Sequence, residues 1–130
     1  MADAYLSTLR PWHDMLRMGL TTWAETPEPT RSDSHAWSAH PNFDLLRLVA
    51  GIRPGAPQFS EIVIEPHLGN LQNLSAAMPH PKGLVEVSYN IESGGGLRAK
   101  IRVPEGVPAR LIWKDHTHIL RSGEQTLQLP

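Results

Sequence analysis

The stretch LVEVSYNIESGGGLRAKIRV, residues 84–103, decides the fold class. Apolar and polar residues alternate from Leu84 to Ile91 and again from Leu97 to Val103, which is the period of a strand with one buried face. Three glycines at 94–96 separate the two runs and favour a tight turn. We therefore expect a β-hairpin in the C-terminal half of the chain.

Shorter candidate strands lie on both sides of this hairpin. Proline, glycine and aspartate residues separate them, and they cover residues 61–65, 74–78, 109–113, 117–120 and 125–129. Short strands at this spacing are typical of an antiparallel sandwich. We predict such a β-sandwich over residues 56–130.

The N-terminal residues follow a different period. Between residues 5 and 18 the apolar residues recur at steps of three and four, which is the period of a helix. Pro11 favours the first turn of a helix, where its missing N–H has no partner to lose, and Gly19 favours the end of that helix.

A second helix is predicted at residues 42–50, with Asn42 as its N-cap and Gly51 after its end. The sequence therefore predicts an α+β chain in two segments. Residues 1–55 form a short helical piece, and residues 56–130 form the sandwich.

The bulk composition argues against several classes of partner. The 130 residues carry a net charge of −1 and have a pI near 6.6, so no strong field attracts nucleic acid or an anionic membrane. Cysteine is absent, which excludes disulfides and thiolate metal sites. Neither a secretory signal nor a run long enough to cross a bilayer is visible, so we expect a cytoplasmic protein.

Two further sets of residues are expected to be structural. His116 and His118 share a strand face, but no third ligand is visible and the segment favours a hairpin, so we expect no metal and no cofactor. Arg98, Lys100 and Arg102 also share one strand face. We expect that face to be solvated or to contact another domain.

The candidate chemistry lies in the proline-interrupted segment 21–40. Aromatic, acidic and basic side chains are concentrated there, namely Trp23, Glu25, Glu28, Arg31, Asp33, His35, Trp37 and His40. An indole packs on the apolar face of a sugar ring, while carboxylates and imidazoles hydrogen-bond its hydroxyls. This composition is compatible with a sugar site.

The order of the motifs adds a resemblance. TTWAE (21–25) is followed by SDSHAW (32–37), GIRP (51–54), IEP (64–66) and GLVEV (83–87). Taken in this order, the series resembles the C-terminal end of the bacterial α-L-rhamnosidases, glycoside hydrolase family 78. The resemblance covers nearly the whole chain.

This resemblance implies the last part of a six-hairpin α/α barrel followed by a C-terminal β-sandwich. The family hydrolyses terminal α-L-rhamnosides with inversion, which requires a general acid and a carboxylate base ~6.5–9.5 Å apart. By position in the TTWAE motif, the resemblance makes Glu25 the general base. It also makes His35 a residue of the rhamnose subsite, with Trp23 and Trp37 as candidate sugar platforms.

Each of these assignments has a structural alternative at this point. Glu25 has the alternative of a solvated or helix-capping carboxylate, because most glutamates are exposed. His35 has the alternative of an ordinary loop histidine bonded to a backbone carbonyl. Trp23 and Trp37 fit barrel-core packing as well as they fit sugar binding.

The general acid of the family lies upstream of the part that this chain resembles, and no motif supports Glu28 or Asp33 in its place. We therefore expect the isolated chain to be inactive, with a rhamnoside substrate and the remainder of the catalytic barrel as its partners. The alternative function is a non-catalytic accessory or carbohydrate-binding sandwich. Helices taken from a barrel expose apolar surface, so we also expect self-association.

Overall fold

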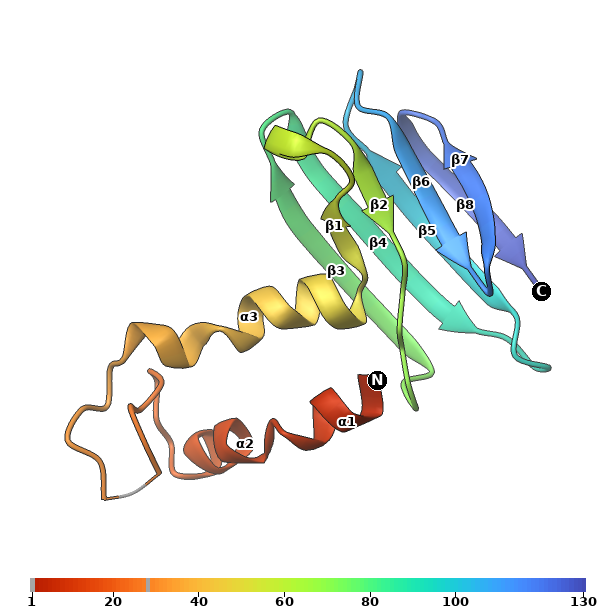
Figure 1. Ribbon diagram of the computed structural model, residues 1–130. Coiled ribbons are helices and arrows are strands. Elements are labelled where there is room, and N and C mark those ends of the chain that lie inside the picture. The colour runs from red at the N-terminus through yellow and green to blue at the C-terminus, as the bar shows by residue number, and fades with distance from the viewer. Residues whose placement is uncertain (1, 28) are drawn as a thin grey trace.

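The strands, which lie between residues 52 and 129, form two sheets that pack face to face (Figure 1). The computed structural model describes residues 2–27 and 29–130. One sheet has the order β1-β2-β6-β7 and the other the order β3-β4-β5-β8. The strands are β1 Ile52–Pro54, β2 Ile62–Ile64, β3 Asn73–His80, β4 Gly83–Ile91, β5 Leu97–Val103, β6 Ala109–Trp113, β7 His116–Leu120 and β8 Gly123–Leu129. The predicted α+β class with a β-sandwich is confirmed.

Burial along the strands follows the alternation of the sequence. In β5 the apolar residues are buried and the basic residues between them are exposed. Both sheets contribute to one core, in which a fully buried Leu or Ile contributes about 1.5–3 kcal/mol. Its largest fully buried side chains are Tyr89, Ile52, Ile62, Ile64, Leu97, Ile101 and Leu111.

One pairing departs from the antiparallel pattern. β2 and β6 run parallel, with Ile62 opposite Ala109 and Ile64 opposite Leu111. Between them the chain builds β3, β4 and β5 of the other sheet before it returns. Parallel neighbours require a long crossover of this kind, because a tight turn reverses the chain direction and can join only antiparallel strands.

The first strand lies ahead of the predicted sandwich. β1 pairs antiparallel with β2, with Ile52 opposite Ile64 and Pro54 opposite Ile62. Pro54 is tolerated because β1 is at the edge of its sheet and ends there. The sheet therefore begins within the segment 1–55 that the sequence assigned to the helical part.

The N-terminal helices begin and end close to where the sequence predicts. Pro11 lies in the first turn of α2, and Gly19 follows its end with a φ of +79°. The helices are α1 Ala2–Ser7, α2 Arg10–Arg17, the 3₁₀ turn η1 Ala36–Ala39, α3 Pro41–Asp44, the π-turn η2 Leu45–Val49 and the 3₁₀ turn η3 Pro57–Phe59.

The predicted N-cap of the second helix is wrong. α3 begins at Pro41, so His40 occupies the N-cap position and makes no side-chain capping bond. Asn42 lies inside the first turn instead. Proline is favoured at the first helical position because its fixed φ suits the helix and its missing N–H needs no partner there.

The helical segment is joined to the sandwich most firmly at its C-terminal end. Val49 and Ala50 are buried, and the buried Tyr89 hydroxyl donates to the Ala50 carbonyl at 2.9 Å. Near the N-terminus, the Asn70 backbone N–H donates to Asp3 Oδ1 at 2.8 Å. In Figure 1 the segment projects from one side of the sandwich, with α1 and α2 running beside α3.

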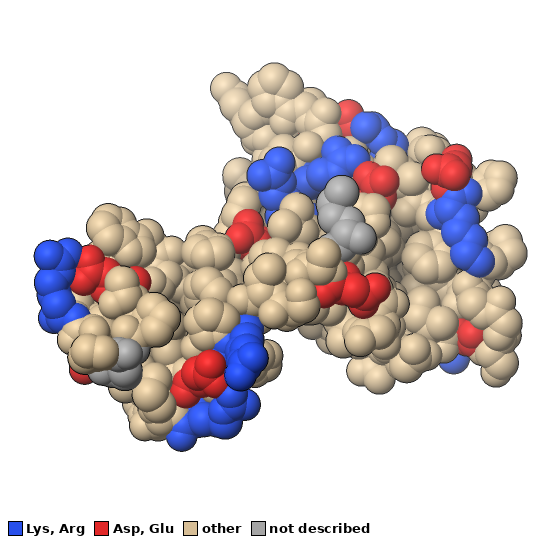
Figure 2. Space-filling view, turned by 60° about the horizontal axis from the view of Figure 1, so that its bottom comes forward, with Lys and Arg blue, Asp and Glu red and all other residues tan. Residues whose placement is uncertain are grey.

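The space-filling view shows the helical segment as a lobe beside the sandwich (Figure 2). Acidic and basic side chains are interspersed over both parts on the face shown, with no large area of one sign. Within the described ranges, no helix is both long enough and apolar enough to cross a membrane.

Candidate active site

Two short segments that flank the proline-rich loop lie antiparallel to each other. The backbone N–H of Glu25 donates to the carbonyl of Ser32 at 2.9 Å, and the N–H of His35 donates to the carbonyl of Trp23 at 2.8 Å. These bonds close the intervening residues into a loop. They also bring the TTWAE motif beside the SDSHAW motif, as a joint site requires.

Glu25 is the best-defined polar group of this region. Its side chain is 13% exposed, and the Arg31 guanidinium meets it as a fork, with Nε 2.8 Å from Oε2 and Nη2 bonded to Oε1. The hydrogen bonds from Arg31 hold the pKa of the Glu25 carboxyl below its ordinary value, partial burial opposes them, and His35 lowers this pKa further. Glu25 is therefore ionised at neutral pH, as a general base must be.

A hollow of about 260 Å³ opens beside this carboxylate. Its lining includes Trp12, Glu25, Trp37 and His40. Indole rings offer an apolar face to a pyranose, while a carboxylate and an imidazole offer hydrogen bonds to its hydroxyls. The hollow thus combines the groups that binding of one sugar ring needs.

The structure brings two of the predicted site residues into the lining of this hollow and leaves two outside it. Glu25 and Trp37 line the same hollow, and Trp37 is 67% exposed. The His35 ring does not line it but lies against Trp37, with ring centroids 4.0 Å apart. Trp23 is partly buried, is not part of the lining, and accepts the His35 hydrogen bond through its carbonyl.

Sequence reasoning left Trp12 outside the candidate segment and gave no individual role to Arg31 or His40, which lie within it. The Trp12 indole N–H donates to the Ser38 carbonyl at 2.7 Å, and its ring meets His40 edge-on at 5.2 Å. His40 Nδ1 lies 2.8 Å from Asp44 Oδ2. The spacing of four residues between His40 and Asp44, at the start of a predicted helix, was a usable signal for this pair.

Comparison with known proteins identifies the domain that follows this loop. The family described as the bacterial alpha-L-rhamnosidase C-terminal domain matches residues 51–128, more than half of the chain. The chain belongs to this family. No curated protein sequence matches the chain significantly.

Solved α-L-rhamnosidases share the fold of this chain. The native enzyme from Aspergillus terreus superimposes with a TM-score of 0.77 and 20% identity over 91% of this chain. The enzyme from Dictyoglumus thermophilum gives 0.71 and 20% over 89%, and that from Streptomyces avermitilis, complexed with L-rhamnose, gives 0.64 and 23% over 91%. These shares exceed the matched domain, so residues of the helical segment belong to the common fold.

The chain spans only a small part of those proteins, namely 15%, 17% and 14% of their lengths. The recognised resemblance to the C-terminal end of an α-L-rhamnosidase is thereby confirmed. The hollow beside Glu25 lies in the part of the chain that precedes the matched domain.

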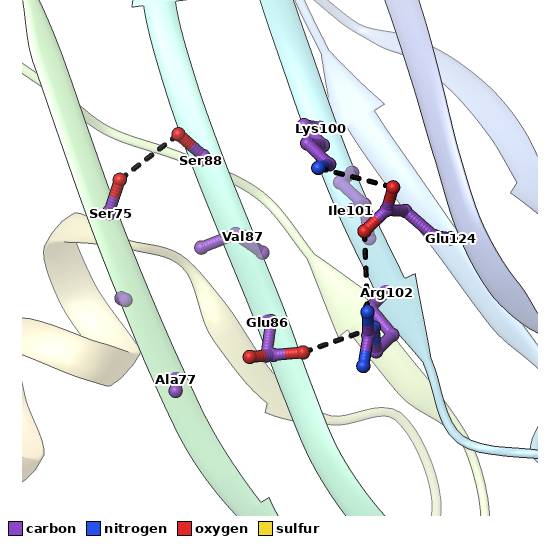
Figure 3. A pocket seen from close by; sticks show the side chains of 10 residues that line it. Ser75, Ala77, Glu86, Val87, Ser88, Lys100, Ile101, Arg102 and Glu124 are labelled. Carbon is purple, nitrogen blue, oxygen red and sulfur yellow. Dashed lines mark hydrogen bonds and ion pairs between the residues drawn. The ribbon is translucent and has the colours of Figure 1, made fainter.

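A second hollow, of about 470 Å³, lies on the outer face of the sheet β3-β4-β5-β8 in the rhamnosidase C-terminal domain (Figure 3). Its charges are paired across strands: Arg102 Nε lies 3.1 Å from Glu86 Oε2, and Lys100 Nζ lies 3.1 Å from Glu124 Oε1. Arg102 also contacts Glu124 at 3.4 Å, and the hydrogen bond from Lys100 is the main cause of the lowered pKa of Glu124. Arg98, Lys100 and Arg102 are exposed, as a solvated strand face requires.

Other acidic groups lie outside the hollow beside Glu25. Among the residues that the structure describes, Glu25 is the acidic residue in its lining. Asp14 lines an adjoining hollow and is paired with Arg17. Asp33 is exposed, and Glu28 lies outside the described residues.

Metal-ligand groups are not clustered in the described ranges, where no set of three or more His, Asp or Glu residues is placed to hold an ion. His116 and His118 lie on β7, directly after a two-residue turn. Lys114 and Asp115 form that turn with φ values of 45° and 66°, which suits the right-handed twist of a hairpin.

Proposed function

We propose that this chain is the C-terminal part of an inverting α-L-rhamnosidase that hydrolyses terminal α-L-rhamnosides, with Glu25 as its general base. One observation carries the proposal: Glu25, whose side chain is 13% exposed and whose carboxylate is ionised, lines a hollow together with the exposed indole of Trp37. The L-rhamnose bound to the structurally similar Streptomyces avermitilis enzyme supports the choice of sugar.

In this proposal the base step uses groups at the hollow. Glu25 accepts a proton from a water that attacks the anomeric carbon, on the face opposite to the leaving oxygen. The low pKa of Glu25 keeps the carboxylate free to accept that proton. Trp37 packs on the apolar face of the sugar and His35, against the Trp37 ring, bonds a sugar hydroxyl. Trp23, whose backbone carbonyl accepts the His35 N–H, is given no direct contact with the sugar in this proposal.

The acid step needs a group from the remainder of the protein. A leaving oxygen must be protonated, and Glu25 is the acidic side chain of the hollow among the described residues. Large apolar side chains are also exposed on the helical segment, at Leu16, Met18, Trp37 and Phe43. Such a surface supports contact with the missing helices of a barrel.

A carbohydrate-binding role for the sandwich alone has less support. The hollow of Figure 3 is lined by paired charges, serines and aliphatic residues, and its lining, which lies wholly within the described residues, contains no aromatic ring. A flat aromatic platform is the group that a sugar-binding sheet face most needs.

The experiment compares three samples on p-nitrophenyl α-L-rhamnoside: the isolated chain, the chain joined to its upstream barrel, and the joined protein with Glu25→Gln. We expect the first to be inactive and the second active. Glu25→Gln should lower kcat by about 10²–10⁴-fold, the range of general acid–base catalysis, and retain L-rhamnose binding. Glu92→Gln, in the exposed β4–β5 turn, is the matched control. Unchanged turnover in Glu25→Gln would exclude the base role.

A further inference from the structure

Arg31 binds the Glu25 carboxylate through two nitrogens. Nε donates to Oε2 at 2.8 Å, and Nη2 donates to Oε1, so the planar guanidinium is matched to the planar carboxylate. A bidentate pair of this kind fixes the plane of the carboxylate as well as its position, which a single point charge does not do.

The backbone of the loop brings the Arg31 and Glu25 side chains within reach of each other. Glu25 and Ser32 are joined by the hydrogen bond from the Glu25 N–H to the Ser32 carbonyl, and Arg31 is the neighbour of Ser32. The Thr30 hydroxyl also donates to the Ser32 carbonyl, at 3.1 Å. Arg31 itself is 82% exposed, so its own burial does not force the contact. The fold of the loop places the guanidinium over the carboxylate.

The fork leaves the carboxylate able to act. Each carboxylate oxygen has two lone-pair positions, and a bidentate arginine occupies one on each oxygen. One position on each oxygen is therefore left for a second donor such as a water, and Glu25 is one of the residues that line the hollow. Arg31 can therefore remain bound while Glu25 accepts a proton.

We propose that Arg31 is a positioning residue that fixes the plane and the ionised state of the Glu25 carboxylate for its reaction with water. This inference rests on the proposed role of Glu25 as the general base. It assigns a function to the short loop between the two motifs, which brings the arginine back to the glutamate six residues earlier in the chain.

The charges around Glu25 determine how its pKa should change when Arg31 is replaced. Arg31 makes the largest contribution to lowering the pKa of Glu25, and His35 adds to it, while His40 lines the same hollow. Removing Arg31 should raise this pKa, so protonation of Glu25 should begin at a higher pH. The same contact makes Glu25 a weaker base, because a lower pKa means a lower proton affinity. In return, the Glu25 carboxylate stays ionised over a wider pH range.

The test is an NMR titration of the Glu25 carboxyl carbon in the full 130-residue chain, wild type against Arg31→Met and Arg31→Lys. We expect the titration midpoint to move to higher pH in Arg31→Met. It should recover only in part in Arg31→Lys, which keeps the charge but loses the fork. Arg17→Met, which removes the exposed arginine paired with Asp14, is the matched control and should leave the Glu25 midpoint unchanged.

An unchanged midpoint in Arg31→Met would overturn the inference, and a wild-type midpoint in Arg31→Lys would show that charge without orientation suffices and would also overturn it. Unchanged amide signals of β4 and β5 confirm that the variants fold. In the joined enzyme, Arg31→Met should move the acidic limb of the pH–rate profile to higher pH and lower kcat. If Glu25 is not the general base, the joined enzyme with Glu25→Gln keeps full activity, so this outcome is distinguished from a failure of the Arg31 inference.

Discussion

The sandwich and the helical segment place their apolar side chains differently. In the sandwich most large aliphatic residues of both sheets are buried in one core, while Leu84 and Ile119 are exposed singly on β4 and β7. Among the described residues of the helical segment, large apolar side chains are exposed at Leu16, Met18, Trp37 and Phe43. The sandwich therefore has within itself the contacts that stabilise it, whereas the helical segment presents apolar surface that another part of the protein must cover.

The division between the two regions does not fall where the helices end. Val49 and Ala50 are helical or follow the helix directly, yet both are buried, and Tyr89 from β4 bonds the Ala50 carbonyl. The last helical turn thus belongs to the core of the sandwich. The preceding helices and the loop that carries Glu25 lie further out.

The largest expected effect contrasts one leucine from each region. Leu111→Ala removes a fully buried side chain of β6 and should destabilise the sandwich by about 2–5 kcal/mol, because a cavity remains. Leu16→Ala removes an exposed side chain of α2 and should change stability by less than about 0.5 kcal/mol. Urea unfolding, followed by the amide signals of β4 and β5, measures both. Equal costs would mean that the helical segment shares the core of the sandwich.

A second contrast uses two glycines of almost equal φ. Gly51 has a φ of +78° and Gly19 one of +79°, but an added Cβ would lie 2.0 Å from the Glu65 carbonyl oxygen at Gly51 and would meet nothing within 4 Å at Gly19. Gly19→Ala should cost roughly 1–2 kcal/mol in the helical segment alone, the conformational cost of a left-handed residue. Gly51→Ala should cost more than about 2 kcal/mol in the sandwich, since strain and clash add.

The same urea titration separates these two variants. For Gly51→Ala the unfolding midpoint of the β4 and β5 signals should fall, while for Gly19→Ala it should stay at the wild-type value. A loss of sandwich stability in Gly19→Ala would show that α2 is coupled to the core, contrary to the comparison of the two regions.

The strands that the sequence predicted best are those with the clearest alternation. Residues 97–103 and 109–113 are strands with the predicted bounds, because one buried face imposes a period of two. β1 was missed, since its sequence IRP has one apolar residue followed by arginine and proline, and its place is set by pairing with β2. The parallel pairing of β2 with β6 likewise depends on partners that are distant in the sequence.

The candidate site likewise has features that the sequence predicted and features that depend on the fold. Motif order singled out Glu25 and His35, with Trp23 and Trp37 as candidate platforms, and the structure places Glu25 and Trp37 in the lining of one hollow and the His35 ring against Trp37. The contact of Arg31 with Glu25 depends on the backbone bond between Glu25 and Ser32, which composition does not reveal. Trp23 was grouped with the site because it lies in the motif, yet its side chain does not line the hollow. The motif therefore predicted which residues belong to the loop better than it predicted which of their side chains line the hollow.

The smallest expected change in stability concerns the apolar surface itself. Phe43 is exposed and lines a hollow of about 630 Å³ together with Leu46, Phe59 and Met78. Phe43→Gln should change the free energy of unfolding by less than about 0.5 kcal/mol, because the side chain is already in contact with water. It should nevertheless reduce self-association of the isolated chain, since an apolar surface without its barrel is free to bind a second copy.

Light scattering over a concentration series measures this association, and Ile119→Gln is the matched control. Ile119 is also exposed, but it lies on the edge strand β7 and outside that hollow. Only Phe43→Gln should shift the chain toward a monomer. If the wild-type chain is a monomer at every concentration, or if Ile119→Gln has the same effect, the apolar surface of the helical segment is not what distinguishes the two regions.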